Sequence, residues 1–277
     1  MLKTSLSGIL LIFAATSAAA ETMPTPEQAD VAWIAEGEFC EPETVLALPD
    51  DTLLVSNVCD FREQGNGFLT LLAGNGDVIA WKHVENLDAP LGMALVNEKV
   101  FVVDNNQVKI FSWPDFEILE TIKLEMTVAN DLAVTPDETI YVTDTAKNFV
   151  MRVDGDRNQE WLTGKDQFPG ANGIAVKGQY LFVGGQRLWK VDLETESIKT
   201  IGPEWLADID GIEFEENEVL QVTPVGGPLV RLLANGETQI LGGEGVGSAN
   251  HGYAPSLGLA LIPTGFDNQV IAIRLAN

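Results

Sequence analysis

Six copies of one short pattern divide the chain, and this repeat restricts the possible folds more than any other feature. Each copy reads as alternating apolar residues, typical of strands, broken by turns at Gly, Asn, Asp or Pro. The copies span residues 42–57, 90–104, 129–144, 171–185, 209–223 and 256–273. A period near 43 residues with about four strands per copy is the spacing of propeller blades.

The last copy ends soon after its third strand and therefore needs an outer strand from elsewhere. Residues 29–39 form a spare strand near the N-terminus that could supply it, and closing the ring in this way removes an exposed sheet edge. We find no helical periodicity of useful length. The sequence therefore predicts an all-β chain, a six-bladed β-propeller whose last blade is closed by an N-terminal strand, with residues 21–277 as a single domain.

Residues 1–20 predict a cleaved secretory signal peptide. They carry one lysine and then an apolar run of 12 residues that ends in three alanines ahead of Glu21. The run is too short to span a bilayer, since a spanning helix needs about 20 residues. We therefore expect a periplasmic or secreted protein with no membrane insertion.

The charge of the chain is strongly acidic, with 16 basic and 41 acidic side chains and a net charge of −25. Such a field repels nucleic acid and anionic membranes. A hydrophobic content of 45% and six tryptophans argue for a packed core rather than disorder. The acidity instead favours solubility and affinity for cations.

Cys40 and Cys59 are the only cysteines. In an oxidising compartment two cysteines are most simply interpreted as one disulfide, and an unpaired thiol is the alternative. Cys40 precedes the first strand of the first copy and Cys59 follows the second, so a bridge would brace the start of that blade.

The second residue of each copy, which we call the anchor residue, marks a candidate site. Because the inner strand of a propeller blade starts beside the central channel, the six anchors should converge at one end of the axis. The anchors are Glu43, Leu91, Asn130, Asn172, Asp210 and Leu257. Asn and Asp also favour the residue before a strand, so a role as turn and capping residues is the alternative.

The two acidic anchors favour a cation. Two carboxylates about 4 Å apart would repel by roughly 4 kcal/mol at an effective dielectric constant near 20, so one must hold a proton or a cation must lie between them. Two carboxylates and two amides are the hard oxygen ligands that suit Ca²⁺, and they leave coordination positions for water or substrate.

At these positions the chain resembles the senescence marker protein, gluconolactonase and luciferin-regenerating enzyme family. The resemblance covers about residues 30–277 and rests on Glu43 before the first strand, "ANDLAV" at 129–134, "ANGIAV" at 171–176 and "DIDGIEF" at 208–214. It implies a six-bladed propeller with a divalent cation at the channel mouth. It further implies that Glu43, Asn172 and Asp210 are metal ligands, and that Asn130 is a ligand or substrate contact.

The same resemblance implies hydrolysis of a lactone or related ester, with Asp210 and Asn130 acting on the substrate. Many sugar lactonases of that family have an arginine two residues before the Asn130 position, where this chain has Val128. A more apolar ester or lactone is therefore expected, rather than the lactone of a polyhydroxy acid. The alternative is a non-catalytic propeller that binds a ligand or protein partner, with any metal purely structural.

Four further residues are candidates for a substrate pocket. His251 and Tyr253 fall in the Gly-rich stretch 242–256, which suits a mobile lid, and His251 could shuttle protons or simply be a solvated loop histidine. Trp205 and Phe168 precede the strands of Asp210 and Asn172. They could line an apolar pocket, or pack between blades.

Overall fold

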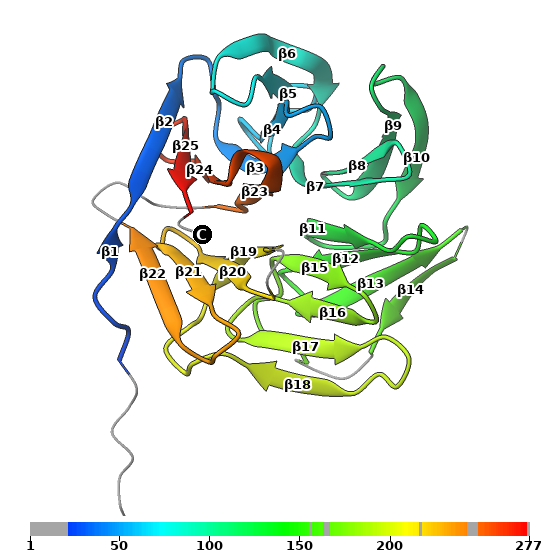
Figure 1. Cartoon of the computed structure of the whole chain (residues 1–277). Helices are drawn as coiled ribbons and strands as arrows, with labels where there is room; N and C mark the ends of the chain where they lie inside the picture. Colours follow the sequence, from blue (N-terminus) through cyan, green and yellow to red (C-terminus); the bar gives the residue numbers. More distant parts are fainter. Residues whose placement is uncertain (1–21, 156, 163–166, 216–217, 243–248, 276–277) are drawn as a thin grey trace, which may run out of the picture.

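The computed structural model describes residues 22–155, 157–162, 167–215, 218–242 and 249–275, and the predicted signal peptide lies outside them. This part of the chain folds into six sheets arranged around an axis, as Figure 1 shows. The predicted six-bladed β-propeller is confirmed. Within the described residues, no helix has the length and hydropathy needed to cross a membrane.

Each of the first three blades is a four-stranded meander that runs in chain order from the axis outward. Blade one consists of β3 (Pro42–Ala47), β4 (Leu53–Asn57), β5 (Gly67–Leu72) and β6 (Val78–Leu87). Blade two consists of β7 (Pro90–Val96), β8 (Lys99–Asp104), β9 (Gln107–Ser112) and β10 (Ile118–Lys123). Blade three consists of β11 (Ala129–Val134), β12 (Ile140–Asp144), β13 (Phe149–Asp154) and β14 (Arg157–Trp161).

The next two blades repeat this order, and the last takes one strand from the N-terminus. Blade four consists of β15 (Ile174–Lys177), β16 (Tyr180–Val183), β17 (Leu188–Asp192) and β18 (Ile198–Ile201). Blade five consists of β19 (Ile209–Phe214), β20 (Leu220–Pro224), β21 (Leu229–Leu232) and β22 (Thr238–Gly242). Blade six consists of β23 (Gly252–Ala254), β24 (Leu259–Thr264), β25 (Gln269–Arg274) and β2 (Asp30–Glu36), with a 3-10 turn, η1 (Pro255–Leu257), after β23.

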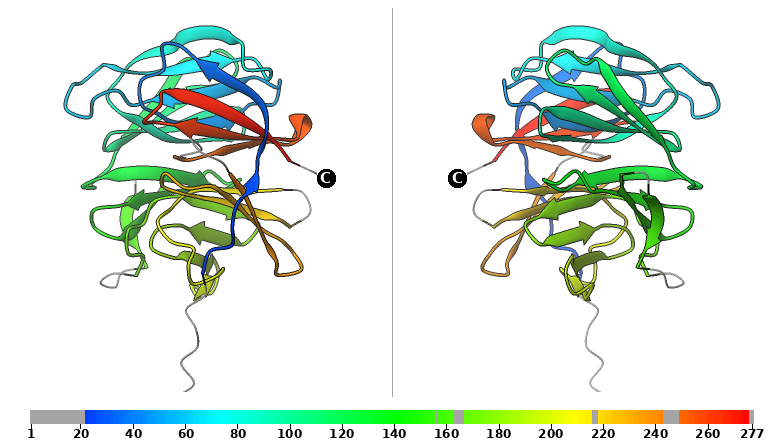
Figure 2. Two further views of the ribbon diagram at one scale, coloured as in Figure 1. Left: turned by 90° about the vertical axis from the view of Figure 1, so that its left-hand side faces the viewer. Right: turned by 90° about the vertical axis from the view of Figure 1, so that its right-hand side faces the viewer.

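The N-terminal segment closes the ring as predicted. Strand β2 pairs antiparallel with β25, near the C-terminus, and the two strands lie side by side in Figures 1 and 2. Just before it, β1 (Glu27–Gln28) pairs parallel with β22 and so extends blade five. One segment therefore ties the last two blades together and covers two edges that would otherwise be exposed.

The core lies between the blades rather than at the centre. Six apolar clusters fill the six gaps between neighbouring sheets, one for each pair. Each sheet is therefore buried on both faces by its neighbours, which is why the repeats read as runs of Val, Ile and Leu. This packing leaves the axis free for polar side chains.

The sixth copy is the one place where the predicted order of strands is wrong. Residues 256–273 contain β24 and β25, the second and third strands of blade six, and not its inner strand. The inner strand is β23, which is only three residues long. Leu257 therefore lies in η1 after that strand, and Asn250, two residues before β23, occupies the position predicted for it.

Candidate functional site

Irregular strand pairing surrounds most anchor residues. Within the described part of the chain, the pairing of the first and second strands shifts register between Pro42 and Val45, between Pro90 and Met93, between Ala129 and Leu132, and between Ile209 and Gly211. Glu43, Leu91, Asn130 and Asp210 lie in these irregular stretches. A β-bulge re-aims side chains and is common beside active sites, so the irregularity separates the anchors from the regular alternation of the strand.

Polar side chains at the ends of the second strands hold the loops that precede the anchors. Asp104 accepts hydrogen bonds from the backbone N–H groups of Asp88 and Ala89, at 2.8 and 2.7 Å. Asp144 accepts one from Thr127 at 2.6 Å. The amide oxygen of Asn57 accepts one from Cys40 in the same way at 3.1 Å. These loops are therefore positioned by buried side chains and not by loop residues alone.

Close approach of neighbouring blades brings the anchors together. A Cβ atom on Gly173 would lie 1.7 Å from the backbone oxygen of Asp210, so only glycine permits blades four and five to meet beside Asn172. The hydroxyl of Thr143 on blade three donates to the backbone oxygen of Asn172 at 2.6 Å. The backbone N–H of Asn250 donates to the backbone oxygen of Glu43 at 2.9 Å, which joins blade six to blade one.

Three anchors present oxygen atoms that accept no hydrogen bond from any described residue. The side-chain oxygens Oδ1 of Asn130, Asn172 and Asp210 are buried and have no hydrogen-bond partner. These residues come from three consecutive blades. Most buried polar atoms in folded proteins are paired, and leaving one unpaired costs about 1 to 3 kcal/mol. Three such acceptors at equivalent positions point to a missing electropositive partner.

The fourth polar anchor, Glu43, shares the electrostatics of this group. Its carboxylate accepts a hydrogen bond from the Thr44 hydroxyl at 2.5 Å. Burial, together with the nearby charge of Asp210, raises the pKa of Glu43 well above its usual range. Burial likewise raises the pKa of Asp210 to about 7. Both shifts mean that two negative charges here are costly without a cation.

This donor set fits a hard divalent cation. The group consists of oxygen acceptors, two from carboxylates and two from amides, and Ca²⁺ prefers such oxygens. Among the described residues, no three His, Cys, Asp or Glu side chains come together as a metal-binding group. Asn130 and Asn172 would therefore have to contribute to any site here, as the sequence predicts.

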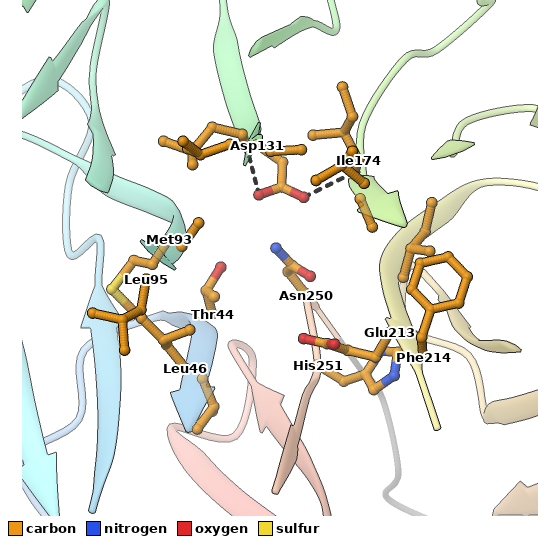
Figure 3. Close-up of a pocket in the computed structure, with 18 of the residues that line it drawn as sticks. Thr44, Leu46, Met93, Leu95, Asp131, Ile174, Glu213, Phe214, Asn250 and His251 are labelled. Atoms are coloured by element: carbon orange, nitrogen blue, oxygen red, sulfur yellow. Dashed lines mark hydrogen bonds between the residues drawn. The ribbon is translucent and has the colours of Figure 1, made fainter. Parts of the chain in front are cut away.

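Beyond the anchors, the channel opens into a cavity of about 330 Å³. Figure 3 shows Thr44, Asp131, Glu213 and Asn250 directed into it. Apolar side chains cover the rest of the wall, among them Leu46, Met93, Leu95, Ile174 and Phe214. Burial raises the pKa of Glu213 to about 8. Polar side chains therefore line the axis beyond the anchors as well.

Asp131 in this cavity is satisfied by the protein, unlike its neighbour Asn130. Its carboxylate accepts a hydrogen bond from the backbone N–H of Leu132 at 2.8 Å and one from Ile174 at 2.9 Å. Gly92 makes room for it, because a Cβ there would lie 1.9 Å from the carboxylate. Burial nevertheless raises the pKa of Asp131 well above its ordinary value. Asp131 thus joins blade three to blade four.

His251 is neither a solvated histidine nor part of a lid. It is 1% exposed, lines the channel cavity, and its Nδ1 lies 3.0 Å from the hydroxyl of Thr223. Its Nε2 is buried and has no hydrogen-bond partner among the described residues, and burial lowers its pKa to about 3. The stretch 249–256 forms the inner strand of blade six and its flanks, with Tyr253 in β23. Residues 243–248 of the predicted lid lie outside the described residues.

The two aromatic candidates lie in the apolar packing between blades. Phe168 is fully buried and makes an edge-on contact with Trp189, at 5.5 Å between ring centroids, inside the apolar cluster between blades three and four. Trp205 is half-buried against the cluster between blades four and five. Both positions support the alternative that we left open, packing between blades.

The predicted disulfide is present. Cys40 and Cys59 are bonded, and no free cysteine remains. The bridge joins the segment just before Glu43 to the turn after β4. It therefore restrains the chain three residues before an anchor, as the order of strands had indicated.

Three channel residues, Asp131, Glu213 and Asn250, were missed by the reasoning from sequence. For Asn250 a signal existed, because the dipeptide Ala249-Asn250 repeats Ala129-Asn130 and Ala171-Asn172. This repeat was overlooked because the Gly-rich residues around Asn250 indicate a loop. Asp131 and Glu213 carry no signal of their own, because acidic residues are frequent throughout this chain.

Comparison with known proteins finds similar folds but assigns the chain to no family. No family model matches the chain, and no curated protein is similar to it in sequence. Virginiamycin B lyase from Staphylococcus aureus, in its selenomethionine form, is similar in structure with a TM-score of 0.60 and 11% identity, over 88% of this chain and 99% of that one.

Two further structures give the same result. A catalytically inactive histidine-to-alanine variant of virginiamycin B lyase from Staphylococcus aureus, with quinupristin, has a TM-score of 0.59 and 12% identity over 88% and 99% of the two chains. A streptogramin B lyase has a TM-score of 0.59 and 12% identity over 88% and 98%. At such identities the likeness concerns the propeller fold alone. Membership of the gluconolactonase-like family stays a prediction.

Proposed function

We propose that the protein is an exported, cation-dependent hydrolase of a lactone or related ester. The observation that carries this proposal is the group of three buried, unpaired oxygens on Asn130, Asn172 and Asp210, beside the carboxylate of Glu43. A structural propeller axis has no need of such acceptors, because each costs free energy when left unpaired.

Each residue of the site would have a separate role, in binding the cation or in acting on the ester. Glu43, Asn172 and Asp210 would hold the cation, with Asn130 as a fourth ligand or a contact to the ester. A bound divalent cation supplies Lewis-acid polarisation of the ester carbonyl. Asp210 would accept the proton of the attacking water or attack the carbonyl itself. Glu43 is held in place through Thr44 and the Cys40–Cys59 bridge.

The site favours an uncharged substrate. The chain has a net charge of −25, so anions are repelled, whereas a neutral ester or lactone approaches freely. Val128 is 41% exposed two residues before Asn130. An apolar side chain at that point offers no hydrogen bond to a polyhydroxylated substrate, which supports a less polar ester.

Two other functions make different predictions. The structural neighbours are named as lyases, so a lyase is a candidate on the same fold, and a ligand-binding propeller without catalysis is another. The products distinguish a hydrolase from a lyase, because hydrolysis adds one water to the substrate and a lyase reaction adds none. Mass spectrometry of the product therefore distinguishes them, and a binding propeller gives no product.

The first experiment is calcium titration by calorimetry on EDTA-treated protein comprising residues 21–277. We expect one tight site that Glu43→Gln weakens strongly, because a charged ligand is lost. Glu194→Gln, an exposed carboxyl on a turn of blade four, is the matched control and should bind as the wild type does. Absence of binding in the wild type would refute the cation site. A screen of lactones and esters with calcium then tests catalysis.

A further inference from the structure

Large apolar side chains are exposed on one end of the propeller, on loops that belong to four different blades. Phe61 is 60% exposed, Val128 41%, Val225 52% and Phe266 92%. We call these four residues the apolar rim. Exposed single hydrophobic residues are ordinary, so their position relative to the anchors decides what they mean.

The order of strands places the rim at the face where the inner strands begin, which we call the anchor face. In each blade, the turn between the second and third strands and the loop before the inner strand lie at this face. Phe61, Val225 and Phe266 are on such turns, and Val128 is on such a loop. Backbone hydrogen bonds join the two kinds of segment, for example Thr145 to Val128 at 3.2 Å and Val225 to Asp208 at 2.8 Å.

Val128 and Val225 lie close to proposed ligands. Val128 is two residues before Asn130. Val225 donates its backbone N–H to the backbone oxygen of Asp208, which is two residues before Asp210. These two rim residues therefore flank ligands of blades three and five.

Phe61 and Phe266 lie on either side of the Glu43 segment. Phe61 follows Cys59, whose disulfide partner Cys40 is three residues before Glu43. The turn that carries Phe266 contacts the same segment from blade six, because the side chain of Asn268 accepts the backbone N–H of Glu41 at 2.7 Å. The rim thus surrounds the proposed site on several sides.

The opposite face of the propeller has no counterpart to the rim. Within the described residues, the remaining exposed large apolar side chains lie on outer strands or in the N-terminal segment, and none lies on a turn of the opposite face. They are Met23, Val31, Ile34, Ile79, Ile118, Leu119 and Ile198. The rim is therefore a property of the face that carries the anchors.

We infer that the rim binds the apolar chain of an amphiphilic substrate, so that the protein acts on esters or lactones with an extended alkyl or aryl group. This inference rests on the proposed function. Neighbouring strands are about 4.8 Å apart, so the turns of the rim lie about 5 to 10 Å outward from the inner strands. The apolar group would extend that far from the reacting carbonyl.

Two other occupants fit the rim less well. An anionic lipid surface is repelled by a chain with a net charge of −25. A second copy of the chain would need a standard interface of about 20 to 30 residues on each side, and four separated side chains do not supply it. A neutral amphiphile needs only the few contacts that the rim offers.

The test compares short and long substrates on calcium-loaded protein. We expect para-nitrophenyl octanoate to be hydrolysed with a kcat/KM at least about tenfold above that of the acetate, since each buried CH₂ is worth about fourfold. Phe266→Ser and Phe61→Ser should each lower the octanoate value about fivefold and leave the acetate value within about twofold. Leu119→Ser removes an exposed side chain from the outer strand β10 and should change neither value.

A second measurement separates failure of the inference from failure of the proposed function. Binding of an octyl-substituted γ-lactam, compared with the unsubstituted lactam, needs no hydrolysis. Tighter binding of the octyl compound that Phe266→Ser abolishes supports the rim even if no ester is cleaved. Hydrolysis that occurs without any preference for chain length, or with a preference that the rim variants keep, overturns the inference and leaves the hydrolase standing. Co-sedimentation with neutral vesicles or dimerisation lost in Phe266→Ser, without lactam binding, also overturns it.

Discussion

Asp131 and Asp210 are both buried at the axis, yet their carboxylates differ in the hydrogen bonds that they accept. Asp131 receives backbone hydrogen bonds from Leu132 and Ile174, whereas the Oδ1 of Asp210 receives none. Asp131 projects into the channel cavity (Figure 3), and Asp210 belongs to the anchors at the mouth. The first is a structural carboxylate that joins two blades. In the second, Oδ1 has no hydrogen-bond partner among the described residues.

The contrast teaches how to find a binding site among many acids. Charge and burial are shared by Asp131, Asp210 and Glu43, so neither property selects the functional group. Hydrogen bonding does separate the two aspartates, because folded proteins rarely leave buried acceptors unpaired, whereas Glu43 accepts a hydrogen bond from Thr44. Two substitutions test the difference between the two aspartates, and a third tests the buried Glu213.

The largest expected effect is on calcium affinity. Asp210→Asn removes a charged ligand and should weaken calcium binding about 100-fold or more, because affinity follows the charge count of the ligands. Asp131→Asn keeps the anchors and should change affinity by less than about fivefold. Calorimetric titration measures both. Equal losses in the two variants would remove the distinction between ligand and structural carboxylate.

The next effect is on the free energy of unfolding in EDTA, which only one of the two variants should lower. Asp131→Asn places an NH₂ group against a backbone N–H and should cost about 2 to 3 kcal/mol in free energy of unfolding. Asp210→Asn relieves repulsion with Glu43 and should leave stability unchanged or slightly higher. Urea denaturation gives both values. A destabilised Asp210→Asn protein would show that this carboxylate has a structural partner.

The smallest effect is on the pH dependence of the free energy of unfolding, through Glu213 in the channel cavity. Burial raises its pKa from 4.5 to about 8 in the folded protein, so between these values the unfolded chain binds fewer protons. The stability associated with neutral Glu213 is therefore fully present below about pH 4.5 and is lost as the pH rises through 8. Glu213→Gln should flatten this part of the profile, measured by urea denaturation. An unchanged slope, as expected for Glu194→Gln, would mean that Glu213 is solvated.

Much of the architecture was accessible from sequence because it repeats. The strand pattern recurs with a period near 43 residues. A wrong prediction for one strand can therefore be corrected by comparison with the other copies. The closing strand at 29–39 followed from a missing partner, and the disulfide followed from having two cysteines in a chain with a predicted export signal. Glu43, Asn130, Asn172 and Asp210 were found because equivalent positions can be compared between copies.

The inner strand of blade six escaped the same reasoning for a physical reason. β23 is three residues long, and its hydrophobic pattern is too short to compete with the turn preference of the glycines around it. The position is secured instead by tertiary contacts, among them the bond from Asn250 to the backbone oxygen of Glu43. His251 was assigned to a loop for this reason and is in fact buried.

By itself, the sequence determined the class of fold, the number of blades, the way the ring closes and the anchor positions of the first five blades, because these depend on local periodicity. Only the tertiary structure decided which buried carboxylates are satisfied and which are not. That difference depends on which backbone N–H groups the neighbouring blade presents: Ile174 presents one to Asp131, and within the described part of the chain none reaches Oδ1 of Asp210. It also placed Phe61 and Phe266 on the anchor face, since residues distant in sequence meet there only once the ring has closed.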